Sequence, residues 1–177
     1  PSLEREEPVK LICREGRLAT LLADLAVHRL DMVIADRPMP DHLNVRGYDH
    51  FLGESGVSVF AAKELATSKG VEFPALLDGA PFLMPGAEVA LHARLLRWFE
   101  AERLCPRIVG EFDDSALMKA FARQGRAYCF APVVLADEIA AVYGLQEIGR
   151  IHSLRETFWL ICSERRIRHP AVRKVFD

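Results

Sequence analysis

Residues 9–36 contain two strand-like apolar runs, separated by a segment whose apolar side chains recur at helical spacing. "VKLIC" (9–13) and "DMVIAD" (31–36) are short apolar runs of the strand type. The segment between them repeats its apolar side chains at helical spacing, at Leu18, Leu21, Leu22, Leu25 and Ala26. This order predicts a strand–helix–strand unit with short connections, ended by Pro38 and Pro40 and typical of a parallel α/β sheet.

The same pattern returns later in the chain. "PRIVGEF", "SALMKAFAR" and "AYCFAP" predict a strand, a helix with Gly125 at its C-cap, and a strand ended by Pro132. A shift of 96 residues aligns the two units without a gap and places Ile12 on Ile108 and Glu15 on Glu111. We therefore expect two similar α/β lobes. Their predicted core positions are Leu21, Leu25, Leu117 and Phe121.

Further elements complete this plan. Residues 55–65 predict a strand, and "FLM" a short strand followed by a Pro85–Gly86 turn. The next helix carries Leu91, Leu95, Leu96, Trp98 and Phe99 on its inner side. "VLADEIAAVYGL" predicts a helix ended by Gly144, residues 156–164 a strand, and Pro170 the start of a last helix.

The expected lobes comprise residues 1–55 plus 160–177 and residues 56–159. The second unit follows a strand–turn–helix, whereas only "PSLEREEP" precedes the first unit. We therefore expect lobe one to lack its first strand and helix, in a chain cut from a longer polypeptide.

Composition narrows the class of protein. Half of the 177 residues are apolar, 27% are charged and the formal net charge is −2, which indicates a globular fold with a substantial core. Lys and Arg form no basic face beside aromatic residues, so direct nucleic-acid binding by this chain is not expected. No apolar run approaches the ~20 residues of a membrane span. The four cysteines are widely spaced, which favours free thiols in a reducing cytoplasm.

Candidate binding residues follow the predicted strands. Ligands of open α/β sheets bind beyond the carboxyl ends of the strands, where helix N-termini present free N–H groups. Three turns fall there, at residues 14–16, 85–88 and 112–115. In the last turn, either Asp113 or Asp114 caps the following helix, which leaves the other carboxylate free for a ligand. Together with Glu15, this carboxylate suits a hard cation or an amine as ligand. Arg14 instead favours an anion, so the sign of the ligand's charge stays open.

Motifs for catalysis are absent from the chain. "GESGVS" lacks the G-x-S-x-G spacing of a nucleophile elbow, and no phosphate-binding loop or metal-binding His motif occurs. The expectation is a protein without enzymatic activity, cofactor or metal site. An enzyme or a solute-binding receptor on the same two-lobed frame are the alternatives.

Three stretches together carry a family resemblance: "REGRLATLLADLAVHRLDMVIADRP", "GEFDDSALMKAFARQGRAYCFAP" and "RRIRHPAVRKVF". They resemble the effector-binding domain of LysR-type transcriptional regulators. "GESGVSVF", "RLLRWFE" and "GEFDDSALMKAF" are further similar to the NhaR-like branch of sodium-responsive activators.

The resemblance implies a two-lobed, periplasmic-binding-protein-like (type 2) fold that binds a small effector, Na⁺ or Li⁺ included, in the cleft between its lobes. It also implies a homodimer or higher homo-oligomer, and DNA contact only through an N-terminal winged helix-turn-helix that this chain does not contain. The residues it marks for effector binding are Arg14, Glu15, Gly16, Asp36, Pro38, Pro85, Gly86, Asp113, Ser115 and Pro132.

Overall fold

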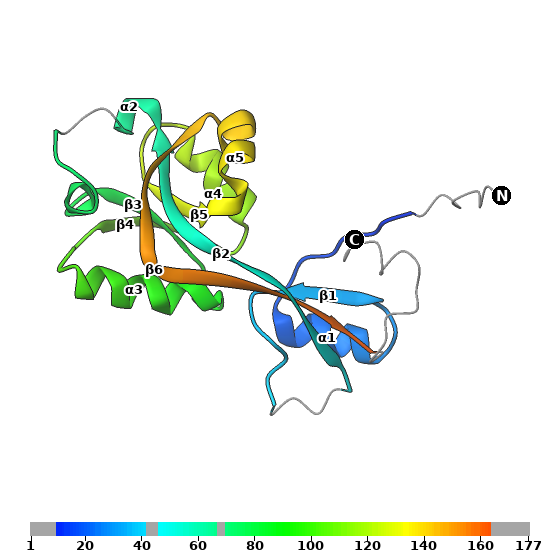
Figure 1. Ribbon diagram of the computed structural model, residues 1–177. Coiled ribbons are helices and arrows are strands. Elements are labelled where there is room, and N and C mark those ends of the chain that lie inside the picture. The colour runs from blue at the N-terminus through cyan, green and yellow to red at the C-terminus, as the bar shows by residue number, and fades with distance from the viewer. Residues whose placement is uncertain (1–9, 42–45, 67–69, 164–177) are drawn as a thin grey trace, which may run out of the picture. The chain divides into compact units, whose positions relative to one another are not determined.

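The computed structural model describes residues 10–41, 46–66 and 70–163, which form two compact units (Figure 1). Unit 1 comprises Pro1–Leu52 and Phe158–Asp177, and unit 2 comprises Gly53–Thr157. Two long strands, β2 (Tyr48–Ala62) and β6 (Leu145–Cys162), each pass from one unit into the other. The helix expected from Pro170 lies outside the described residues.

Unit 1 is built around α1 (Leu18–Ala26) and β1 (Met32–Ala35). β1 pairs antiparallel with β6, with Met32 opposite Cys162 and Ala35 opposite Trp159. Leu22 and Leu25 of α1, three residues apart on one helix face, pack with Val33 and Ile161 in a small buried cluster. The predicted helix and its following strand are therefore confirmed.

The prediction of a strand at residues 9–13 is wrong for residues 10–13, the part that the structure describes. Residues 10–17 adopt no regular structure, and Leu11 and Ile12 are 71% and 65% exposed. An isolated apolar run becomes a strand only when a neighbour accepts its hydrogen bonds. No strand of the four-stranded sheet of the described residues, in the order β1-β6-β2-β5, pairs with this segment.

Unit 2 contains the parallel strands that the sequence predicts. β3 (Pro81–Pro85) pairs parallel with β4 (Arg107–Phe112), and Phe82 forms a parallel bridge to Tyr128, directly ahead of β5 (Cys129–Pro132). The helices α3 (Ala90–Ala101) and α4 (Ser115–Ala122) connect these strands. β5 also pairs antiparallel with β2, so parallel and antiparallel strands are both present.

Short elements close the unit. α2 (Lys63–Ala66) follows β2, and a 3₁₀ turn, η1 (Ala75–Leu77), precedes β3. After β5 come a second 3₁₀ turn, η2 (Val133–Leu135), and α5 (Ala136–Tyr143). Gly144 ends α5 with a left-handed φ of 67°, as its sequence position predicts.

The core of unit 2 joins α3 to the strands. Leu91, Leu95, Trp98 and Phe99 are buried, as the helical spacing predicts. Phe82 contacts Phe99 edge-on at a ring-centroid distance of 5.2 Å. Leu96 is 47% exposed, so its assignment to the inner side was wrong.

The core face of α4 also differs from the sequence prediction. Leu117 and Phe121 are each 49% exposed, whereas Met118 and Ala122 are almost completely buried. Both pairs have the i, i+4 spacing that the apolar pattern provides, so the pattern alone cannot choose between them. Packing against the sheet selects Met118 and Ala122 and leaves the neighbouring pair at the surface.

This difference predicts unequal costs for two truncations in one helix. Met118→Ala should lower the free energy of unfolding by about 2–5 kcal/mol, because it opens a cavity in the core. Leu117→Ala should lower it by less than ~1 kcal/mol, because half of the side chain is already in water. Chemical denaturation of both variants measures the two values, and equal costs would contradict the assigned face.

Candidate functional site

Three parallel strands of unit 2 end at one edge of the sheet. β3 ends at Pro85 and β4 at Phe112, and the Phe82–Tyr128 bridge aligns β5, which ends at Pro132, with them. α3 and α4 begin shortly after β3 and β4, so their N-termini lie at the same edge. Five of the predicted site residues lie at this edge, which we call the strand-end edge: Pro85, Gly86, Asp113, Ser115 and Pro132.

Asp114 is the residue that caps α4. Its Oδ1 accepts hydrogen bonds from the backbone N–H groups of Ala116, at 2.7 Å, and Leu117, at 3.1 Å. Its backbone carbonyl accepts from the N–H of Met118 at 3.0 Å. The two bonds to its carboxylate use donors that a helix start otherwise leaves unpaired. The sequence predicted that one of the two aspartates would act as the cap, and the structure assigns this role to Asp114.

Asp113 lies against the turn that follows β3. A Cβ atom at Gly86 would collide with Oδ1 of Asp113, so any larger residue here would require the Asp113 side chain to move. The N–H of Gly86 also donates to the carbonyl of Phe112 at 2.8 Å. The turns after β3 and β4 are therefore in direct contact.

His92 adds a contact to this turn that sequence reasoning missed. Its Nδ1 lies 2.7 Å from the carbonyl oxygen of Pro85, and because a carbonyl only accepts, Nδ1 carries the proton. Pro85 and Gly86 are themselves buried. His92 thus fixes the end of β3 through the first turn of α3.

Lys119 is a second residue that the sequence did not mark. It is only 8% exposed, its Nζ donates to Ser115 Oγ at 3.2 Å, and it lies 5.7 Å from the ring centroid of Tyr143. Burial lowers the pKa of this ammonium group, while nearby Cys129, Asp114, Glu138 and Glu156 act in the opposite direction. The one sequence signal was its spacing of four residues from Ser115, which places both on one helix face.

The other predicted site residues belong to unit 1. Arg14, Glu15 and Gly16 are exposed in the segment before α1. Asp36 follows β1, and its Oδ1 lies 3.3 Å from Nε of Arg37. Pro38 is exposed two residues further on.

The acidic residues of the strand-end edge do not form a metal-binding cluster. Within the described ranges, no group of three or more His, Cys, Asp or Glu side chains has the arrangement to hold a metal ion. Glu111 and Asp113 are exposed, while the Asp114 carboxylate is engaged as a cap.

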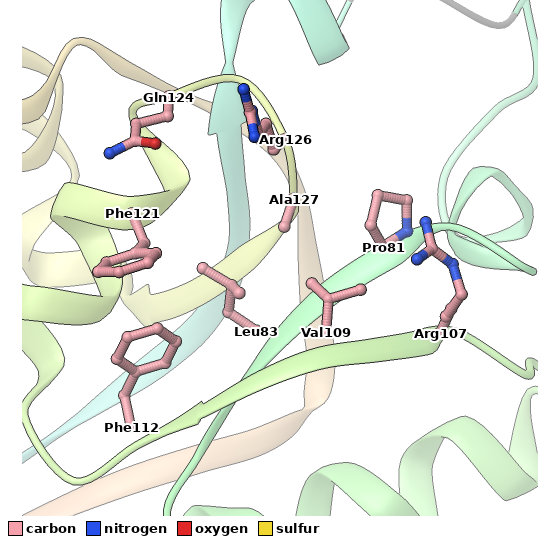
Figure 2. A pocket seen from close by; sticks show the side chains of 9 residues that line it. All are labelled: Pro81, Leu83, Arg107, Val109, Phe112, Phe121, Gln124, Arg126 and Ala127. Carbon is pink, nitrogen blue, oxygen red and sulfur yellow. The ribbon is translucent and has the colours of Figure 1, made fainter.

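A surface pocket of about 370 Å³ lies between β4 and α4 (Figure 2). Phe112 and Phe121 pack against each other at one end of it, at a ring-centroid distance of 5.1 Å, and Leu83 and Val109 also line it. Its remaining lining residues are Pro81, Arg107, Gln124, Arg126 and Ala127. Sequence reasoning missed this pocket because it placed Phe121 in the core.

None of the helices in the described part of the chain combines the length and the apolar character that crossing a bilayer requires.

Comparison with known proteins identifies the family. Residues 3–177 match the family model of the LysR substrate binding domain. The chain is 37% identical over 169 residues to the transcriptional activator protein NhaR of Escherichia coli (strain K12), and equally to that of Shigella flexneri. The match covers 96% of this chain and 55% of each relative, so the chain spans about half of their length.

Solved structures share the fold. A variant of the HypT regulatory domain from Salmonella typhimurium superimposes with a TM-score of 0.69 at 12% identity, covering 97% of this chain and 84% of that one. The CcmR regulatory domain of Synechocystis in complex with 2-PG gives 0.63 at 13% identity, over 90% and 76%. The effector-binding domain of QuiR in complex with shikimate gives 0.64 at 14% identity, over 91% and 76%.

The chain therefore belongs to the LysR substrate-binding domain family. The resemblance found in its sequence motifs is confirmed, and so is the two-lobed type 2 fold that it implied. The relatives are regulators of transcription, in agreement with the absence of a catalytic motif in the sequence.

The two aspartates before α4 are expected to differ in their effect on stability. Asp114→Ala should lower the free energy of unfolding by about 0.5–2 kcal/mol, because two backbone N–H groups lose their acceptor. Asp113→Ala serves as the matched control, because the Asp113 carboxylate is exposed and accepts no hydrogen bond among the described residues. It should change stability by less than ~0.5 kcal/mol. Urea denaturation compares the variants, and a larger cost for Asp113→Ala would contradict the assignment of the cap.

Proposed function

We propose that this chain is the effector-sensing module of a LysR-type transcriptional activator. A small effector binds at the strand-end edge of unit 2, and Arg14, Glu15, Gly16, Asp36 and Pro38 of unit 1 stay candidate effector-binding residues. The observation that carries the proposal is the convergence of three strand ends and two helix N-termini at that edge, where open α/β sheets bind ligands. DNA contact then falls to a winged helix-turn-helix elsewhere in the polypeptide, and we place the regulator in the cytoplasm.

Similar proteins support a small effector, which is either an alkali-metal cation or a small organic molecule. The resemblance of the sequence motifs to sodium-responsive activators and the exposed carboxylates of Glu111 and Asp113 favour Na⁺ or Li⁺. CcmR in complex with 2-PG and QuiR in complex with shikimate favour a small organic molecule. An enzymatic role on the same frame finds no support among these regulators.

We also propose that the chain self-associates through the outer side of β4 and α4. β4 pairs only with β3 in the two-stranded sheet of the described residues, which leaves its other edge without a strand. Val109 of β4, 44% exposed, lines the pocket together with the half-exposed Phe121 of α4, and Ile108 and Leu117 are 39% and 49% exposed. An apolar surface next to an open strand edge favours association with a second copy.

A thermal-shift experiment tests whether the effector is a cation. The midpoint of unfolding is compared in sodium, lithium, potassium and choline chloride at equal ionic strength. A cation at about a hundred times its dissociation constant adds ~2.7 kcal/mol, which raises the midpoint by several degrees. A rise with sodium and lithium alone, reduced in Asp113→Asn, is the result expected for a cation effector. No ion-specific rise would exclude it and direct the search to organic effectors.

The self-association surface predicts a dissociating substitution. Phe121→Glu should shift the protein towards the monomer in sedimentation velocity, because it buries a charge in the apolar interface. Val142→Glu is the matched control, since Val142 is 56% exposed on α5 and outside this surface. Equal association of both variants and the unchanged protein would contradict the proposed interface.

A further inference from the structure

Lys119 is a buried cation without a counter-ion. It is 92% buried, since its exposure is 8%, and it takes part in none of the ion pairs among the described residues. Its polar contacts are the 3.2 Å hydrogen bond to Ser115 Oγ and the Tyr143 ring, 5.7 Å away. Burying a charge without a partner costs stability, and a hydrocarbon side chain would suit the fold better. The position therefore calls for a reason other than packing.

The groups that face Lys119 leave its charge uncompensated at contact distance. Asp114 lies on α4, Glu138 and Tyr143 on α5, Cys129 on β5 and Glu156 on β6. The Asp114 carboxylate already accepts two backbone hydrogen bonds. Burial raises the pKa of the Cys129 thiol to about 12, so this group is neutral near pH 7.

The hydrogen-bond donors at the N-terminus of α4 show that the Lys119 ammonium group acts through Ser115. The N–H groups of Ala116, Leu117 and Met118 are all used by Asp114. Ser115 is exposed, and its Oγ accepts from Lys119, so its hydroxyl hydrogen is left to donate outwards. The strand-end edge thus presents an exposed hydroxyl donor with a buried positive charge directly behind it.

This arrangement discriminates between ligand charges. An oxyanion accepts from the hydroxyl and is attracted by the ammonium group and by the N-terminus of α4. A metal cation is repelled by the same ammonium group and finds one lone pair of Ser115 Oγ already occupied. Every helix N-terminus attracts anions weakly, so this feature alone would not mark a binding site. The additional feature here is Lys119, which is nine-tenths buried and donates to Ser115.

We propose that Lys119 is the positioning and selectivity residue of the effector site: it fixes Ser115 as a hydrogen-bond donor and makes this edge bind a carboxylate or similar oxyanion in preference to an alkali-metal cation. This inference rests on the proposed effector-binding function and specifies its ligand class. It assigns a role to a residue that contacts the effector only through Ser115.

A pH dependence follows from the surroundings of Lys119. Burial holds its pKa below the usual 10.5, so the ammonium group loses its proton earlier than an exposed lysine does as pH rises. The neutral amine no longer attracts an anion and can itself accept from the Ser115 hydroxyl. Carboxylate affinity therefore falls as pH rises through the lowered pKa of Lys119, and it falls at a lower pH than an exposed lysine would give.

The experiment measures binding to the full chain by calorimetry and thermal shift. Potassium acetate, glycolate and shikimate are the carboxylate probes, and sodium and lithium chloride are the cation probes, with potassium chloride as the reference at equal ionic strength. The variants are Lys119→Met, which keeps the length without the charge, Lys119→Arg, which keeps the charge, and Ser115→Ala. Ser115→Ala changes an exposed side chain and guards against a folding defect at position 119.

We expect at least one carboxylate to bind the unchanged protein, and the dissociation constant to rise at least ten-fold in Lys119→Met and in Ser115→Ala. Lys119→Arg should retain most of the affinity and extend it to higher pH, and the pH dependence should disappear in Lys119→Met. A merely structural lysine would not produce this pH signature.

Two results would overturn the inference in distinguishable ways. A response to sodium or lithium alone, or carboxylate binding that Lys119→Met leaves unchanged, would refute the role of Lys119 and leave the effector-binding function in place. Failure of every carboxylate and every cation to bind the unchanged protein would refute this inference and count against the strand-end edge as an effector site.

Discussion

Parallel pairing of β3 with β4, continued by the bridge from Phe82 to Tyr128, is the constraint on which the rest of unit 2 depends. Because parallel strands end on the same side, the pairing places their carboxyl ends, and the starts of the helices that follow, at one edge. Phe82 anchors the arrangement from the core through its ring contacts with Phe99 and Phe130. Residues distant in the sequence, such as Gly86 and Asp113, meet there as a result.

The electrostatics of this edge depend on which charges are already engaged. Formal charge suggests an acidic turn, yet Asp114 is committed to the helix cap and Asp113 lies against Gly86. The buried ammonium group of Lys119, in contrast, has no carboxylate within ion-pair distance among the described residues. At short range, an uncompensated buried charge outweighs exposed charges, because water screens it less.

α4 contributes to both surfaces proposed here. Its first turn carries Asp114 and Ser115 at the strand-end edge, and its outer side carries Leu117 and Phe121 beside the pocket. A single helix of eight residues moves as one body, so a shift at its N-terminus also displaces these apolar side chains. In the proposed scheme, α4 links effector binding to self-association within unit 2, which is the kind of coupling a regulatory domain requires.

The sequence by itself determined the local elements and the family. Helical spacing, Gly144 and the prolines located α1, α3, α4, α5 and most strands, because these signals act within a few residues. The strand-end turns were located for the same reason, and the motifs carried the LysR resemblance. Only the tertiary structure decided which of two equivalent apolar pairs in α4 is buried, that residues 10–13 form no strand, and that Lys119 lies beneath Ser115. Each of these depends on a partner distant in the sequence: the sheet against α4, a neighbouring strand, and the packing of α5 and β5 around the lysine.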